Sequence, residues 1–146
     1  MHTNGFIHAD IKIPNVVLHR FPEEDGQMEA PILKICDFGL VQIMDPQLGN
    51  KALMKTMCGT KGYIAPEIGS YNTLVGPEID MWSFGVMLYE LCVAYKPTEM
   101  RNYRYGSGPI PFRDRDWKKI SPLVIKLINE CLEMDPQKRI TAEEAL

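Results

Sequence analysis

The chain has 146 residues, of which 45% are hydrophobic and 24% are charged, with 11 glycines and 11 prolines. That length fits one domain or part of a larger one, and the composition excludes a disordered, collagen-like or coiled-coil chain. Sixteen basic and 19 acidic side chains give a formal net charge of −3, which argues against a surface adapted to nucleic acid or to anionic lipid. We therefore expect neither nucleic acid nor a membrane among the partners.

The four cysteines lie far apart in the sequence and form no CxxC pair, so the pattern indicates neither a zinc site nor a redox dithiol. The first ten residues have no basic flank and no apolar stretch of signal-peptide length. The most apolar segment, residues 84–95, is interrupted by Glu90 and is shorter than the ~20 residues that span a bilayer. We expect reduced, mostly buried thiols and a soluble protein of the cytoplasm or the nucleus.

Short β-rich runs lie in the first third of the chain, at residues 6–7, 16–18 and 32–36. A polar stretch at residues 22–27 separates the last two runs, which suits the loop of a long hairpin. From residue 45 to 73 the hydrophobic periodicity is lost while Gly, Pro, Asn and Thr accumulate. We expect this stretch to be an extended surface loop, of the kind that often carries function.

Helices are predicted in the second half. Residues 77–93 have almost no polar face, which is typical of a helix buried on all sides. Ser121 at the N-cap and Pro122 at the first helical position begin an amphipathic helix, which the Asp-Pro at residues 135–136 ends.

Both ends of the sequence suggest that it is a piece of a larger domain. Thr141 and Glu144 have the spacing of a capping box, which begins a helix, but the sequence stops at Leu146. The short strands and the buried helix are preceded by too little chain to cover them. We therefore expect truncation at both ends.

Residues 8–15 read HADIKIPN and place polar groups between two strand-like runs. At this spacing Asp10 can accept a proton, Lys12 can neutralise phosphate charge, and Asn15 can bind a hard cation through its amide oxygen. By itself the motif also fits a polar turn.

A second carboxylate follows a strand in the tripeptide Asp37-Phe38-Gly39. The glycine lets the backbone turn sharply beside the strand edge. Asp37 and Asn15 would together make a Mg²⁺ site with few protein ligands, as expected when substrate phosphates supply the other oxygens. An isolated Asp-Phe-Gly is otherwise most often a turn.

Further motifs read CGTKGYIAPE at residues 58–67, DMWSFG at residues 80–85 and DPQKR at residues 135–139. Together with residues 8–15 and 37–39 they follow the order found in the eukaryotic protein kinases, which the whole chain resembles. The resemblance implies an α+β fold, the large C-terminal lobe of a kinase domain, mainly helical with short β-hairpin strands at the catalytic loop.

The resemblance further implies that residues 1–146 form a partial kinase domain. The small lobe, with its Gly-rich loop and strand lysine, has no counterpart in this sequence and would lie upstream of Met1. Because phosphoryl transfer depends on positioning and electrostatic clamping, the chain without that lobe would be inactive.

The implied reaction is transfer of the γ-phosphate of ATP, with Mg²⁺, to Ser or Thr hydroxyls of a protein substrate. By resemblance Asp10 would be the catalytic base, Asn15 would bind the second Mg²⁺, and Asp37 would bind the Mg²⁺ that bridges the ATP phosphates. Lys12 would lie against the transferring phosphate. Lys12 and Thr60 resemble the serine/threonine class rather than the tyrosine class.

Other matched positions are implied to be structural. Glu67 and Arg139 would form a buried ion pair at the end of the activation segment, and Asp80 would hydrogen-bond the backbone of the catalytic loop. His8 and Phe38 would pack in the regulatory stack.

Ala9 departs from the family, which usually has arginine beside the catalytic aspartate. That arginine pairs with a phosphorylated residue of the activation segment. Thr56 lies where many kinases are phosphorylated, but without the arginine we expect its phosphorylation to have little effect. His2 and His19 carry no functional signal.

Two other interpretations stay open. One is a non-catalytic interaction module, which binds a kinase or a substrate through the surface of the large lobe and is inactive because the small lobe is missing. The other is an unrelated Mg²⁺ hydrolase that uses Asp10 and Asp37, which leaves residues 65–67 and Asp80 unexplained.

Overall fold

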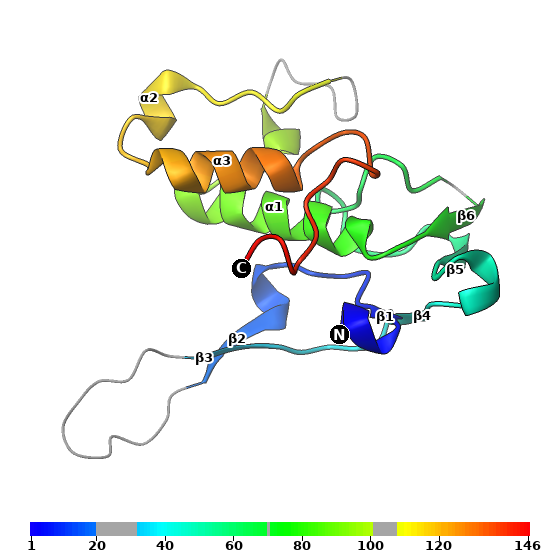
Figure 1. Cartoon of the computed structure of the whole chain (residues 1–146). Coiled ribbons are helices and arrows are strands. Elements are labelled where there is room, and N and C mark those ends of the chain that lie inside the picture. Colours follow the sequence, from blue (N-terminus) through cyan, green and yellow to red (C-terminus); the bar gives the residue numbers. More distant parts are fainter. Residues whose placement is uncertain (20–31, 70, 101–107) are drawn as a thin grey trace, which may run out of the picture.

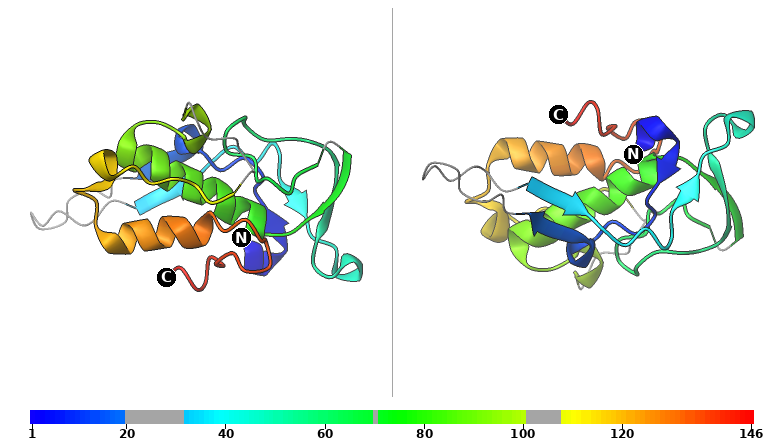
Figure 2. Two further views of the ribbon diagram at one scale, coloured as in Figure 1. Left: turned by 90° about the horizontal axis from the view of Figure 1, so that it is seen from above. Right: turned by 90° about the horizontal axis from the view of Figure 1, so that it is seen from below.

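The computed structural model of the protein describes residues 1–19, 32–69, 71–100 and 108–146. The described strands form three separate two-stranded sheets, and the two longest helices, α1 and α3, pack side by side (Figure 1). Figure 1 shows α3 on one side of α1 and the β2–β3 hairpin on the other, and Figure 2 gives the same arrangement from above and below. Within the described ranges, no helix has the length and apolar character needed to cross a membrane.

The hairpin predicted from the sequence is present. β2 (Val16–His19) pairs with β3 (Ile32–Ile35) in antiparallel register, while the predicted loop at residues 22–27 lies outside the described residues. β1 (Phe6–Ile7) pairs with β4 (Gln42–Ile43), also antiparallel. β4 was not predicted, because two residues are too few to show an alternating pattern.

The third sheet corrects the prediction that residues 45–73 are loop throughout. β5 (Ala52–Thr56) pairs antiparallel with β6 (Tyr71–Val75), and a short 3-10 helix, η3 (Pro46–Leu48), precedes β5. Burial alternates along β5 from Ala52 to Lys55, but only Ala52 and Met54 are buried. So short an alternation is hard to recognise from the sequence alone. β6 begins 15 residues after β5 ends, so the pairing of the two strands depends on tertiary contacts.

α1 (Glu78–Val93) is the centre of the core, and only Leu91 on this helix is exposed. Trp82, Val86 and Tyr89 are fully buried, so the prediction of a helix covered on nearly all sides is confirmed. Gly85 allows α3 to approach closely, since a Cβ at that position would lie 2.6 Å from the Cβ of Cys131.

α3 (Pro122–Cys131) has the predicted N-cap, because the Ser121 hydroxyl accepts a hydrogen bond from the backbone N–H of Leu123. The helix ends at Cys131, earlier than the predicted stop at residues 135–136. The predicted capping box near the end of the chain is also formed, with Glu144 N–H donating to Thr141 Oγ1 at 3.2 Å. It begins a turn and not a helix.

The remaining elements are short. They are the helix α2 (Asp114–Trp117) and the 3-10 helices η1 (His2–Asn4), η2 (Ile13–Asn15) and η4 (Pro97–Glu99). All four cysteines are free, as predicted, but only Cys131 is buried and the other three are half-buried.

Candidate active site

The segment between β1 and η2, residues 8–12, is tied to the buried helix α1. The Asp80 carboxylate, 1% exposed, accepts hydrogen bonds from the backbone N–H of His8 at 2.7 Å and of Ala9 at 2.8 Å. Ala9 has φ of 63°, a left-handed conformation that is rare for residues other than glycine. Asp80 thus holds the backbone in the strained turn that presents Asp10.

His2 is part of this arrangement, although the sequence carried no signal for it. Its Nε2 lies 2.8 Å from Oδ2 of Asp80, the same oxygen that accepts from His8. The two residues are 78 positions apart in the sequence, and no local pattern marks a contact over that separation.

Three of the predicted site residues come together around the carboxylate of a fourth, Asp10. The Thr60 hydroxyl donates to Oδ1 at 2.6 Å, and Lys12 Nζ donates to Oδ2 at 2.7 Å and to Thr60 Oγ1 at 2.8 Å. Asn15 Nδ2 donates to the backbone carbonyl of Asp10 at 2.9 Å and to Oδ2 at 3.3 Å. We call Asp10, Lys12, Asn15 and Thr60 the Asp10 cluster.

These contacts decide the charge of Asp10. Burial acts most strongly and would raise the pKa of Asp10, but hydrogen bonds from Lys12, Thr60 and Asn15 and the charge of Lys12 outweigh it. The pKa of Asp10 therefore lies below its usual value, and the carboxylate is charged at neutral pH. Burial, with the charge of Asp10, raises the pKa of the nearby Cys58 thiol, so this sulfur stays protonated.

Asp37 is not a member of the hydrogen-bonded Asp10 cluster, although the backbone N–H of the preceding residue, Cys36, donates to the Asn15 carbonyl at 2.9 Å. Asp37 is exposed, has φ of 63° and accepts a 3.4 Å hydrogen bond from the backbone N–H of Gly39. Among the described residues, no hydrogen bond or ion pair joins Asp37 to Asp10, Lys12 or Asn15. The structure therefore does not bring the two predicted Mg²⁺ ligands into direct contact.

The oxygen donors available here nevertheless fit a magnesium ion. The amide nitrogen of Asn15 is used by Asp10, which leaves its Oδ1 as an acceptor, and the Asp37 carboxylate has a single backbone contact. Mg²⁺ prefers such hard oxygens and commonly takes its other ligands from phosphates and water. The described ranges contain no group of three or more His, Cys, Asp and Glu side chains that could hold a metal by themselves.

The rings of His8 and Phe38, which the resemblance assigns to the regulatory stack, are in contact. Their ring centroids are 5.4 Å apart in an edge-to-face arrangement. His8 is fully buried, with Nε2 lying 3.1 Å from the carbonyl oxygen of Cys36. Phe38, the middle residue of the Asp37-Phe38-Gly39 turn, is 58% exposed.

The loop at residues 59–63 lies directly on residues 8–12; we call it the acceptor loop. Gly59 has φ of 106°, and a Cβ there would lie 2.9 Å from the backbone oxygen of Ala9. Glycine is therefore required at this position both by conformation and by space. This close approach brings Thr60 within hydrogen-bond distance of Asp10.

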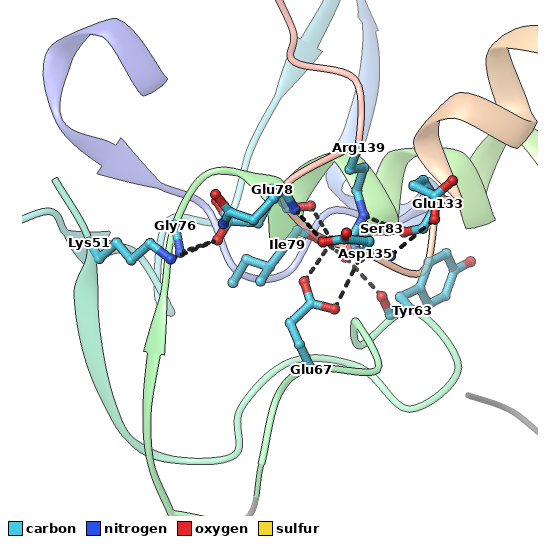
Figure 3. Close-up of polar contacts among 11 residues, drawn as sticks. Lys51, Tyr63, Glu67, Gly76, Glu78, Ile79, Ser83, Glu133, Asp135 and Arg139 are labelled. Atoms are coloured by element: carbon cyan, nitrogen blue, oxygen red, sulfur yellow. Dashed lines mark hydrogen bonds and ion pairs between the residues drawn. The ribbon is translucent and has the colours of Figure 1, made fainter. Parts of the chain in front are cut away.

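Arg139 connects Glu67, which follows the acceptor loop, to the core (Figure 3). Its side chain is fully buried and forms a two-pronged ion pair with Glu67, at 2.6 and 3.1 Å. It also donates to the backbone carbonyls of Glu78 at 2.8 Å and Glu133 at 3.0 Å, and its guanidinium lies 5.0 Å from the centre of the Trp82 ring. One cation thus joins Glu67, the start of α1 and the turns that follow α3.

Comparison with known proteins identifies the family. The model of the family described as "Protein kinase domain" matches residues 1–146. The chain is 38% identical over 152 residues to calcium/calmodulin-dependent protein kinase type IV of Homo sapiens, covering 100% of this chain and 30% of that protein. It is 33% identical over 153 residues to the probable serine/threonine-protein kinase fhkC of Dictyostelium discoideum, covering 100% of this chain and 24% of that protein.

A third relative is ribosomal protein S6 kinase 2 alpha of Xenopus laevis, 30% identical over 154 residues, with 100% of this chain and 20% of the relative covered. The chain thus spans less than a third of the length of these curated relatives. Because the family model matches the chain from end to end, the chain belongs to the eukaryotic protein kinase family, of the serine/threonine type.

Proposed function

We propose that the chain is the large-lobe part of a protein serine/threonine kinase, which transfers the γ-phosphate of ATP to Ser or Thr hydroxyls of a protein substrate. The Asp10 cluster is the observation that carries this proposal. A charged, buried carboxylate is oriented by Thr60 and Asn15 and lies 2.7 Å from the Lys12 ammonium. A proton acceptor directly beside a cation suits transfer of an anionic phosphoryl group to a hydroxyl.

In the proposed mechanism Asp10 accepts the proton of the substrate hydroxyl. Oδ1 already accepts from Thr60, and Oδ2 accepts from Lys12 and Asn15, but a carboxylate has about four acceptor positions, so the substrate hydroxyl can bind to one that is left. Thr60 and Asn15 hold the carboxylate in orientation, and Lys12 offsets the charge that develops on the phosphoryl oxygens.

Magnesium and ATP would be held by groups around this cluster. Asn15 and Asp37 would bind the metal through oxygen, and Lys12 would bind phosphate. When bound, Mg²⁺-ATP supplies the phosphoryl group and neutralises much of its charge. We propose that the small lobe precedes Met1 in the complete protein, and that the protein works in the cytoplasm or the nucleus.

The direct test is transfer of labelled phosphate from ATP by the complete protein to a mixed protein substrate. We expect phosphoserine and phosphothreonine without phosphotyrosine, and complete loss of transfer when EDTA removes Mg²⁺. Activity that persists in EDTA, or phosphate found on tyrosine, would contradict the proposal. Transfer absent from a complete protein that contains a small lobe would also contradict it.

The non-catalytic interaction module is a second candidate, favoured by apolar side chains exposed on the β2–β3 hairpin. Leu18 is 54% exposed and Leu33 is 64% exposed, and such apolar surface is commonly covered by other protein. The mass of the native protein separates the two candidates. A native chain of about this length that binds a partner and transfers no phosphate would favour the module.

Phosphorylation at Thr56 is expected to have little effect. Thr56 ends β5, is exposed, and lies opposite Tyr71 of β6, while Ala9 offers no cation to a phosphate. Backbone pairing therefore orders this part of the segment without a phosphate anchor. In the complete protein, Thr56→Glu should change kcat less than about twofold, with Thr56→Ala as the matched control. A large gain in activity from Thr56→Glu would refute this.

A further inference from the structure

Lys96 lies where α1 meets η4 and is enclosed by negative charge. Its ammonium is 3.0 Å from Glu99 Oε1 and 3.6 Å from Glu90 Oε1, and it lies 5.6 Å from the centre of the Tyr63 ring. Only 22% of the Lys96 side chain is exposed. The hydrogen bond to Glu99 raises the pKa of Lys96 more than burial lowers it. The side chain is therefore positively charged at neutral pH and is held in place by its carboxylate partners.

The carbon stem of Lys96 supports the acceptor loop. Gly62 has φ of 94°, and a Cβ at this position would lie 3.3 Å from both Cδ and Cε of Lys96. The next residue, Tyr63, donates from its hydroxyl to Glu90, one of the two carboxylates that hold the ammonium. Its carbonyl accepts a 2.9 Å hydrogen bond from the Ser83 hydroxyl. Lys96 therefore contacts the loop directly and shares Glu90 with it.

The other end of the same loop contacts the catalytic group. Thr60 donates to Asp10 at 2.6 Å, two residues before Gly62. Lys61, between them, is exposed. A substrate hydroxyl bound to the Asp10 carboxylate would therefore lie close to Thr60, in a loop that is held at Thr60 by Asp10 and at Tyr63 by Lys96 and Glu90.

We propose that Lys96 is a positioning residue for the protein substrate, acting through the acceptor loop. It keeps residues 62–63 against the end of α1, so that the loop is already ordered when the substrate binds, and less entropy is lost on binding. The proposal rests on the kinase function proposed above. It assigns no contact between Lys96 and ATP, because its charge partners, Glu90 and Glu99, lie outside the Asp10 cluster.

Lys96→Met tests this in the complete protein, since methionine keeps most of the stem and removes the charge. We expect KM for a serine peptide, selected by the wild-type protein from a random library, to rise about tenfold. We expect kcat and the KM for ATP to stay within about twofold. Lys96→Arg, which can still pair with both carboxylates, should restore KM for the peptide.

Lys126→Met is the matched control, because Lys126 is 71% exposed on α3 and its 3.6 Å partner is Glu130, outside the loop. This substitution makes the same change in net charge and should leave kcat, the KM for the peptide and the KM for ATP unchanged. If Lys96→Met does not fold, Glu99→Gln weakens the same clamp and leaves the contact between Tyr63 and Glu90 in place. A fall in kcat equal to the rise in KM, or no change in either, would overturn the proposal.

Amide hydrogen exchange over residues 58–64 gives a readout that needs no phosphate transfer. Lys96→Met should speed exchange in this segment about tenfold relative to the wild type and to Lys126→Met, while Lys96→Arg should not. If the wild-type protein transfers no phosphate, the proposed function fails, whereas unchanged exchange in Lys96→Met refutes the role of Lys96. The two failures are therefore distinguishable.

Discussion

Replacing Asp10 by asparagine in the complete protein should lower kcat for phosphate transfer by about 10³-fold, the usual contribution of a general base. Asparagine has nearly the same shape, and its amide oxygen can still accept from Thr60 or Lys12, so the loop should keep its fold. It cannot take up the proton of the substrate hydroxyl. Steady-state kinetics with the wild-type protein and the variant at saturating ATP measures the effect.

Asp37→Asn is the comparison that separates the base from the metal ligand. Within the described ranges no hydrogen bond or ion pair joins Asp37 to the Asp10 cluster, so the two variants change separate groups. Asp10→Asn should keep the KM for Mg²⁺-ATP, whereas Asp37→Asn should lose the Mg²⁺-dependent transfer itself. An Asp10→Asn protein with kcat close to that of the wild type would show that Asp10 is not the base.

Replacing Arg139 by leucine should lower the free energy of unfolding by about 3–5 kcal/mol, the range found when one partner of a buried ion pair is removed. The change leaves the Glu67 carboxylate and the carbonyls of Glu78 and Glu133 without their shared donor. Because domains are stable by only about 5–15 kcal/mol, this is a large part of the total. Urea unfolding of the complete protein, followed by the fluorescence of its tryptophans, measures the loss.

Lys138→Leu is the control for a neighbouring cation. Lys138 is 74% exposed and lies 3.6 Å from Asp135, so its loss should change stability by less than about 0.5 kcal/mol. If Arg139→Leu does not fold, Glu67→Gln can replace it, because it removes the charge of the other partner. The Glu67 side chain is 21% exposed, so Glu67→Gln should lower the free energy of unfolding by less than Arg139→Leu. A value within about 1 kcal/mol of the wild type for Arg139→Leu would contradict the proposed structural role.

Several elements follow from local patterns. The continuous apolar run of α1, the Ser121-Pro122 start of α3 and the β-branched runs of β2 and β3 are properties of neighbouring residues, and all four elements are present. Side-chain periodicity and capping act over one or two turns, which is why they can be recognised without tertiary information. The order of the motifs was sufficient to indicate the kinase family.

The β5–β6 pairing was missed for the opposite reason. Thr56 and Tyr71 are paired in the sheet, yet 14 residues separate them in the sequence, and those residues have no hairpin signal. Strand pairing over such a separation is decided by which backbone groups the core brings together. The end of α3 was misplaced for a related reason, since Arg139 draws the following turns back to α1 through the carbonyls of Glu133 and Glu78.

The sequence alone determined the family, the principal helices and the identities of the residues around Asp10. The tertiary structure decided which of them are hydrogen-bonded: Lys12, Asn15 and Thr60 donate to Asp10, whereas the Asp37 carboxylate accepts from the backbone of Gly39. It also decided that His2 contacts Asp80 and that Lys96 lies between Glu90 and Glu99. Residue type and spacing are local properties, whereas hydrogen bonds and ion pairs act over a few ångströms and require the folded core to bring distant segments together.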